Sequence, residues 1–258
     1  MLKTKKIAIL GCGWLGEKIA NFFHQKHWEV FTFNSSSTHK EYFQNKGLRA
    51  FQIDLNKKNE NYKDFFNHFE AIVISVPMSR QADKAQLNLL FKNISNLLSN
   101  SKATIFLCSS TGIYPQEIGF FNEQSFDNEV LNERIFTLEQ IILNFNPKVN
   151  ILRLGGLMGD TRVFHQYFSV QDSKEAVNHI HYHDIILIIE QMIFQKSQSK
   201  IYNVVAPIHP SKKAIFEFQK NKNMINDEVD DSRIILSDTL IQELNYTFVF
   251  PNPIYFEN

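Results

Sequence analysis

The chain has 258 residues, 43% of them hydrophobic, so it can bury a large core without disulfides or a structural metal. Lysine plus arginine equals aspartate plus glutamate at 27 each, and this balance argues against nucleic-acid binding and against attraction to an anionic membrane. Cys12 and Cys108 are too few for a secreted disulfide scaffold, no signal peptide is recognisable, and no apolar run is long enough to span a membrane, so we expect a cytoplasmic protein.

Short apolar runs alternate with helical patterns through the first 155 residues, without a proline-rich or serine-rich linker. This alternation is typical of βαβ units, and apolar strands without strict alternation are typical of a parallel sheet covered on both faces. The expected strands are Lys6–Leu10, Glu29–Phe33, Arg49–Ile53, Ala71–Val76, Thr104–Cys108 and Asn150–Leu154. Apolar residues at helical spacing predict helices around Leu15–Phe23, Leu87–Leu97 and Ile135–Ile142.

After Gly159 the pattern loosens. We expect strands at Ala176–His181 and Ile201–Val205, and helices at Ile185–Phe194 and Ser211–Lys220. The predicted fold is therefore α/β, a doubly wound parallel Rossmann sheet with a smaller C-terminal substrate lobe. Residues 1–158 would form the nucleotide-binding domain, and residues 159–258 a mixed segment that completes the sheet and forms the lobe.

Glycine is scarce in this chain. Nine glycines in 258 residues is about half the average usage of about 7%, so we expect glycine mainly where the backbone requires it. Six of the nine fall in two clusters, which are Gly11, Gly13 and Gly16 near the start and Gly155, Gly156 and Gly159 past the middle.

The first cluster lies in Gly11-Cys12-Gly13-Trp14-Leu15-Gly16, which follows a predicted strand and opens a predicted helix. In this context G-x-G-x-x-G provides a tight turn, a close approach of a pyrophosphate to the backbone, and close packing of helix on strand. The helix N-terminus adds unpaired N–H groups and a partial positive charge for phosphate. We predict that these six residues bind NAD(P); the alternative is a tight turn without a ligand.

Sites that prefer NAD usually have an acidic residue at the end of the second strand. Here that place holds Asn34, followed by Ser35, Ser36 and Ser37, and then by Thr38, His39 and Lys40. Hydroxyls and a lysine without a carboxylate favour NADP over NAD, although the same run also suits a solvated turn that caps the next helix.

Two further segments at the strand ends are candidates for cofactor contact. Asp54 could reach the adenine edge, or be an ordinary turn residue. Ser75, Val76 and Pro77 follow the fourth strand at the sheet edge where such folds bind ligands, or they simply end the strand.

Later motifs carry a resemblance to a known family. Ser109-Ser110-Thr111-Gly112-Ile113-Tyr114 follows the fifth strand, and the stretches 151–159, 181–184 and 201–205 come in the same order as in that family. Together with the opening loop, they resemble the extended and atypical branch of the short-chain dehydrogenase/reductase superfamily, which contains nucleotide-sugar epimerases and dehydratases. The resemblance covers nearly the whole chain and implies a small-molecule substrate. Superfamily members often pair through helices that correspond to Leu87–Leu98 and Arg134–Leu143, so it also allows a homodimer.

In that family a Ser or Thr orients the substrate oxygen, a Tyr is the acid/base, and a Lys four residues after the Tyr lowers its pKa. Ser110 matches the first role, with Thr111 beside it, but no Tyr or Lys lies between Tyr114 and Lys148. Hydride transfer needs a paired proton transfer from a group of tuned pKa. Tyr114, Glu133 and Arg134 are the remaining candidates for the acid/base. The alternative for Tyr114 is a ring packed at the lip of the pocket, and the alternative for Glu133 and Arg134 is a solvated first turn of a helix.

The leading hypothesis is an NAD(P)-binding oxidoreductase or epimerase-like enzyme with an atypical active site, acting on a small polar or nucleotide-sugar-like substrate. The second is a catalytically inactive NADP-binding module. A β-hydroxyacid-dehydrogenase-like enzyme would share the opening loop and a fourth strand that ends in proline, but not the segment from Ser109 to Tyr114.

His179, His181 and His183 alternate along a predicted strand and so could share one face. The stretch resembles a part of the superfamily that binds no metal, and we predict no metal here. Asp184 fits the N-cap of a helix that begins at Ile185.

Overall fold

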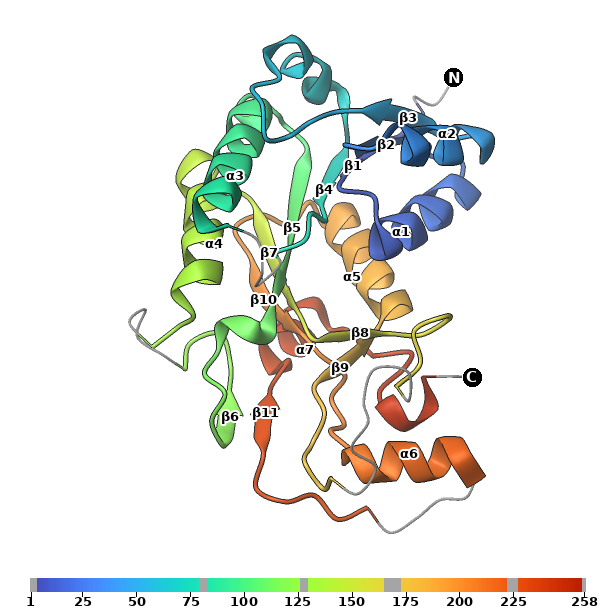
Figure 1. Cartoon of the computed structure of the whole chain (residues 1–258), viewed down its shortest axis with the longest axis vertical. Coiled ribbons are helices and arrows are strands. Elements are labelled where there is room, and N and C mark those ends of the chain that lie inside the picture. The colour runs from blue at the N-terminus through green and yellow to red at the C-terminus, as the bar shows by residue number, and fades with distance from the viewer. Residues whose placement is uncertain (1–3, 79–82, 126–129, 165–172, 222–226, 257–258) are drawn as a thin grey trace. The chain divides into compact units, whose positions relative to one another are not determined.

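The computed structural model describes residues 4–78, 83–125, 130–164, 173–221 and 227–256 (Figure 1). Its central sheet has seven strands in the order β10-β7-β5-β4-β1-β2-β3, and the pairs β3–β2, β2–β1, β1–β4 and β4–β5 are parallel. The strands are β1 (Lys6–Leu10), β2 (Glu29–Asn34), β3 (Arg49–Gln52), β4 (Ala71–Ile74), β5 (Thr104–Ser110), β7 (Asn150–Leu154) and β10 (Ile201–Val204). The predicted α/β fold is confirmed.

Helices alternate with these strands along the chain. They are α1 (Trp14–Gln25), α2 (Ser37–Asn45), α3 (Lys84–Leu98), α4 (Glu133–Phe145), α5 (Tyr182–Phe194), α6 (Lys212–Asn221) and α7 (Asp238–Leu244). Short 3-10 helices are η1 (Glu60–Tyr62), η2 (Phe65–His68), η3 (Thr111–Ile113) and η5 (Pro253–Tyr255). Two small parallel sheets pair β6 (Gly119–Phe121) with β11 (Arg233–Ile235), and β8 (Gly156–Met158) with β9 (His179–His181).

Packing divides the chain into two compact units. Unit 1 comprises Met1–Ser109, Glu133–Leu152 and Met192–Lys200, and unit 2 comprises Ser110–Asn132, Arg153–Gln191 and Ile201–Asn258. The units interleave in sequence, whereas the sequence-based division placed one boundary between residues 158 and 159. The difference arises because Ser110–Asn132 packs with later segments and Met192–Lys200 packs with earlier ones.

Phenylalanine fills much of the core of unit 1. Phe31 and Phe33 on β2 meet Phe65 and Phe66 of η2, with ring centroids between 5.0 and 6.2 Å apart for Phe31–Phe65, Phe33–Phe65 and Phe33–Phe66. Such aromatic pairs contribute beyond their buried area. Strand β1 is almost entirely buried beside this cluster, which fixes the position of the loop that follows it.

The structure corrects one local prediction. Helix α5 begins at Tyr182, so Asp184 lies in its first turn and is not its N-cap. The fully buried carboxylate of Asp184 instead accepts hydrogen bonds from the Tyr246 hydroxyl at 2.7 Å and from the backbone N–H groups of Val249 and Phe250 at 2.8 and 3.0 Å. It anchors the C-terminal segment.

Within the ranges described above, no helix combines the length and the hydropathy that crossing a membrane would require.

Candidate functional site

The loop after β1 packs tightly against the end of β4. Gly11 has φ +79°, its N–H donates to the Phe33 carbonyl at 3.0 Å, and its carbonyl accepts from the Gly13 N–H at 2.8 Å. A Cβ at Gly11 would lie 2.8 Å from Val76 Cγ1 and 2.9 Å from the Ser75 carbonyl oxygen. Both the left-handed backbone and the close approach therefore require glycine here.

Gly13 has the opposite surroundings. It is exposed and precedes α1 in the N-cap position, and a Cβ built on it would meet no heavy atom within 4 Å. Among the described residues, no side chain makes a capping hydrogen bond at this helix end. The space beside Gly13 at the N-terminus of α1 is therefore open, which a phosphate group would need in order to approach a helix N-terminus.

The other residues of the glycine loop pack it against the rest of unit 1. A Cβ at Gly16 would lie 3.1 Å from Ile9 Cγ2, so Gly16 lets α1 approach β1 closely. Leu15 is buried and Trp14 is half-buried. Cys12 is a free, buried thiol whose pKa is raised by burial, so it is unreactive packing within the loop.

A pocket of about 330 Å³ lies against this loop, at the ends of β1 to β4. Its lining comprises Gly11, Cys12, Gly13, Phe33, Asn34, Ser35, His39, Ile53, Leu55, Asn56, Ser75, Val76, Pro77 and Leu90. Eight of the predicted cofactor residues line it, and among the lining residues described none is Asp or Glu. Trp14, Leu15, Gly16, Ser36, Ser37 and Asp54 are not part of the lining.

Sequence reasoning missed the apolar walls of this pocket. Phe33 and Ile53 were interpreted only as strand residues and Leu90 as helix core, and Leu55 was not considered, although Phe33, Ile53 and Leu55 lie at or just after the ends of β2 and β3. Apolar residues at the carboxyl ends of parallel strands were the available signal, because ligands of such sheets bind at this edge.

Asn34 locks the end of β2 onto the glycine loop. Its Nδ2 donates to the Cys12 carbonyl at 2.9 Å, and Gln52 Nε2 donates to the neighbouring Ser35 carbonyl at 3.0 Å. Helix α2 begins two residues later, and its N-cap, Ser36, makes no side-chain capping bond. The positive end of α2 is thus presented beside Ser35.

Asp54 and Ser75 are each held by neighbours. Asp54 Oδ1 accepts from the N–H of Asn56 at 3.0 Å, and this bond is the leading cause that lowers the pKa of Asp54. Ser75 hydrogen-bonds to the Cys108 thiol, whose pKa burial raises to about 12. Asp54 therefore shapes a turn, while Ser75 lines the pocket from the end of β4.

In unit 2, Ser110 and Thr111 differ in what their hydroxyls do. Ser110 Oγ accepts from the Gly112 N–H at 3.0 Å, and within the described residues its own proton is given to no acceptor. The buried Thr111 donates to the Leu154 carbonyl at 3.3 Å. Ser110 is therefore the hydroxyl that can still donate to a ligand.

Tyr114 is held in a polar network inside unit 2. Only 2% of it is exposed, its hydroxyl donates to Asn203 Oδ1 at 2.8 Å and accepts from Arg153 Nη1 at 2.9 Å, and burial raises its pKa. Asn203 is fixed in turn because Glu123 Oε1 accepts its N–H at 2.6 Å. This arrangement matches the packed-ring alternative for Tyr114 better than an acid/base role.

The two candidates on α4 lie in unit 1. The Glu133 side chain is 81% exposed, and its carboxylate pairs with Lys84 of α3 at 2.5 Å. Arg134 is half-buried on the first turn. Further along the helix, buried Glu139 accepts from the Ser109 hydroxyl at 2.5 Å and so ties α4 to β5.

The three histidines do not form a metal centre. His179 and His181 are buried, and burial lowers the pKa of each to about 4. The His181 ring stacks on Phe250 with centroids 3.8 Å apart, and a Cβ at Gly159 would lie 2.2 Å from His181 Nε2. No cluster of three or more metal-ligating side chains occurs among the residues whose placement is described.

Two comparisons show which proteins this chain resembles in sequence. Residues 6–118 match the family model for the NAD binding domain of 6-phosphogluconate dehydrogenase, so this stretch is similar to an NAD-binding Rossmann domain. Protein YeeZ of Escherichia coli (strain K12) is 26% identical over 270 residues, covering 97% of this chain and 98% of that protein.

Solved structures share the fold across nearly the whole chain. UDP-N-acetylglucosamine 4-epimerase from Bacillus cereus is 17% identical with a TM-score of 0.74, over 98% of this chain and 96% of that one. The Bordetella bronchiseptica enzyme WbmG in complex with NAD is 14% identical with a TM-score of 0.75, over 99% of this chain and 93% of that one.

Proposed function

We propose that this chain binds a nicotinamide dinucleotide through unit 1 and acts as an epimerase-like oxidoreductase on a small polar or nucleotide-sugar-like substrate. The observation that carries the cofactor part is the open face at Gly13, which lines a pocket of about 330 Å³ just before the first residue of α1. The adenosine half fits the apolar walls of Phe33, Ile53 and Leu55, and the pyrophosphate fits the helix end.

Within this proposal NADP is preferred over NAD. The described lining of the pocket contains no carboxylate that would repel a 2′-phosphate, and it contains Ser35 and His39 as donors. The uncapped N-terminus of α2 adds a partial positive charge at the same place. The two free thiols, Cys12 and Cys108, favour the reducing cytoplasm as the compartment.

Isothermal titration calorimetry with NADPH and NADH tests the cofactor and its preference. We expect NADPH to bind more tightly than NADH. Ser35→Asp introduces a charge at the 2′-phosphate position and should weaken NADPH about tenfold or more while sparing NADH. Asn45→Asp, at the far end of α2, is the matched control. If both variants weaken NADPH binding equally, the 2′-phosphate argument is refuted. If neither dinucleotide gives heat, the proposed cofactor binding is refuted.

The catalytic part of the proposal rests on Ser110. The nicotinamide supplies hydride transfer when bound. Ser110 would donate a hydrogen bond to a substrate oxygen, because its hydroxyl proton is available while that of Thr111 is used internally. The resemblance to epimerases of the short-chain superfamily and the fold of the solved neighbours over nearly the whole chain support this role, whereas the match to the NAD binding domain of 6-phosphogluconate dehydrogenase extends over residues 6–118.

The second candidate function is a binding module without turnover. It is favoured by one observation, that Tyr114 and Glu133 are already engaged, with Asn203 and Arg153 and with Lys84 respectively. A screen for NADPH oxidation over carbonyl substrates separates the two. Turnover that falls about 100-fold in Ser110→Ala with unchanged NADPH affinity supports the enzyme. Tight NADPH binding with no oxidation across the screen supports the module.

A further inference from the structure

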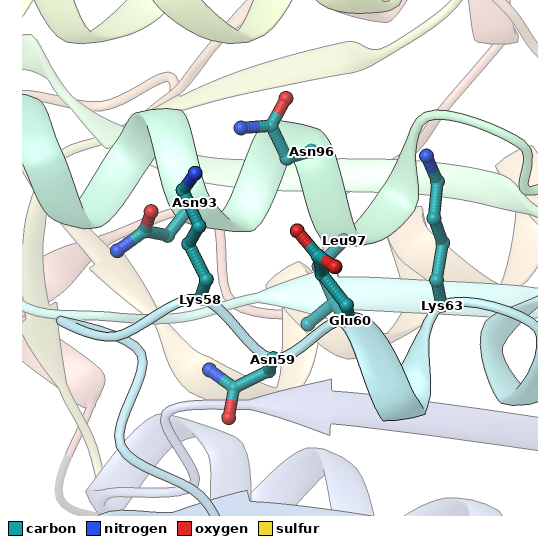
Figure 2. Close-up of a pocket in the computed structure, with 7 residues that line it drawn as sticks. All are labelled: Lys58, Asn59, Glu60, Lys63, Asn93, Asn96 and Leu97. Carbon is teal, nitrogen blue, oxygen red and sulfur yellow. The ribbon is translucent and has the colours of Figure 1, made fainter.

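A second pocket lies in unit 1, between the segment after β3 and one face of α3. Its volume is about 440 Å³, within the usual range of small-molecule sites. Figure 2 shows its lining residues, which are Lys58, Asn59, Glu60, Lys63, Asn93, Asn96 and Leu97. None of them lines the pocket at the glycine loop, so the two pockets are distinct.

The charged side chains of this pocket are exposed or half-buried. Lys58, Glu60 and Lys63 rise from the segment at η1 toward α3 (Figure 2), and none of the three forms an ion pair within the described part of the chain. By contrast, nearby Lys57 pairs with Asp54 at 3.6 Å. Two unpaired ammonium groups and one carboxylate give the pocket a net positive charge.

Hydrogen bonds hold the side-chain amides of Asn93 and Asn59 in the wall of this pocket. Asn93 is only 7% exposed, and its Nδ2 donates to the Leu55 carbonyl at 3.1 Å. Asn59 Nδ2 donates to the carbonyls of Asp54 and Lys57 at 2.9 and 2.7 Å. These bonds fix the wall of the pocket, so its shape does not need to be assembled by a ligand.

We propose that this pocket binds a small phosphorylated polyol, such as a sugar phosphate. Lysine ammonium groups bind phosphate as point charges, which assigns the phosphate to one of the two lysines, Lys58 or Lys63, at either end of the pocket (Figure 2). A bare anion would be repelled by Glu60, whereas hydroxyl groups donate to a carboxylate and to amide oxygens. Leu97 provides the apolar surface for the carbon skeleton.

Calorimetry with ribose 5-phosphate as the probe tests this site. We expect saturable binding to the wild-type chain, weakened about tenfold or more in Lys58→Ala/Lys63→Ala because the charge-assisted contact to the phosphate is lost whichever lysine makes it. Lys148→Ala removes an exposed charge from the loop between α4 and β7 and should leave the affinity unchanged. The Gly13→Ala variant should also bind as the wild type does, because Gly13 lines the other pocket.

Two comparison ligands test the chemical class. Inorganic phosphate should bind more weakly than ribose 5-phosphate, and uncharged ribose should give no measurable heat. No binding of ribose 5-phosphate, or binding that the double lysine variant leaves unchanged, would overturn the site. Inorganic phosphate binding as tightly as ribose 5-phosphate would overturn the polyol assignment. Failure of NADPH to bind would bear only on the other pocket.

Discussion

Gly11 and Gly13 are two residues apart, but alanine should have different effects at the two positions. It should destabilise the fold at Gly11 and weaken NADPH binding at Gly13. Gly11→Ala places a methyl group at φ +79°, which costs about 1–2 kcal/mol, and forces it to within 2.9 Å of Val76 and Ser75, which costs about 1–3 kcal/mol more. We expect a loss of roughly 2–5 kcal/mol in the free energy of unfolding. Gly13→Ala meets no atom within 4 Å and should change that free energy by less than about 0.5 kcal/mol.

The same methyl group at Gly13 occupies the space where a pyrophosphate would approach α1. Loss of one charge-assisted hydrogen bond at that helix end corresponds to about a tenfold to hundredfold loss in NADPH affinity. Urea unfolding measures the first quantity and calorimetric titration with NADPH the second. Gly13→Ala should therefore be stable but defective in binding.

Gly47 provides the control for backbone strain. Its φ is +78°, nearly that of Gly11, but a Cβ there would meet nothing within 4 Å. Gly47→Ala should therefore cost only the backbone part, about 1–2 kcal/mol. If Gly11→Ala is no more destabilising than Gly47→Ala, the packing argument is refuted. If Gly13→Ala binds NADPH as tightly as the wild type, the assignment of the phosphate to this helix end is refuted.

Three further predictions concern unit 2. Gly156→Ala would set a Cβ 2.3 Å from His179 Cδ2, so urea denaturation should show a loss of roughly 2 kcal/mol or more, and a wild-type midpoint would contradict the contact. Asp184→Asn turns an amide NH₂ toward the donors Tyr246, Val249 and Phe250, so stability should fall by roughly 2 kcal/mol; an unchanged melting temperature would dismiss the anchor. Burial lowers the pKa of His179 and His181 to about 4, whereas unfolded histidine titrates near about 6.5, so the unfolded state gains protons first as the pH falls. The stabilising contribution of the two neutral histidines should be complete above about pH 6.5 and decline toward pH 4. The charges of Lys212 near His179 and of His183 near His181 lower these pKa values further. If the buried ring causes the decline, His179→Gln should make the free energy of unfolding less dependent on pH.

The first half of the fold could be predicted because its signals are local. The strand β1 and the glycine loop form one continuous pattern, and β7 coincides with the predicted Asn150–Leu154. The start of α2 was not predicted: the run from Asn34 to Lys40 was interpreted as cofactor contacts or as a turn that caps the next helix, whereas α2 already begins at Ser37, with a polar sequence that buries only Phe43. The pairing of β6 with β11 joins segments more than 100 residues apart, and no local pattern marks it.

The candidate site was also predictable only in part, because some of its features come from local sequence patterns and others from contacts between distant segments. The spacing of Gly11 and Gly13 indicated a phosphate turn from the sequence alone. The engagement of Tyr114 with Asn203 joins residues 89 positions apart, and the need for Gly156 comes from a ring on β9 that packs over it. Contacts of this kind are set by the tertiary fold, so they become visible only when the strands are placed.

A crystal structure of the chain grown with NADPH tests the central claim most directly. The claim predicts the adenosine between Phe33, Ile53 and Leu55, and a pyrophosphate oxygen within about 3 Å of an N–H group at the start of α1. A dinucleotide bound elsewhere, or a pocket at Gly13 without NADPH at saturating concentration, would contradict it.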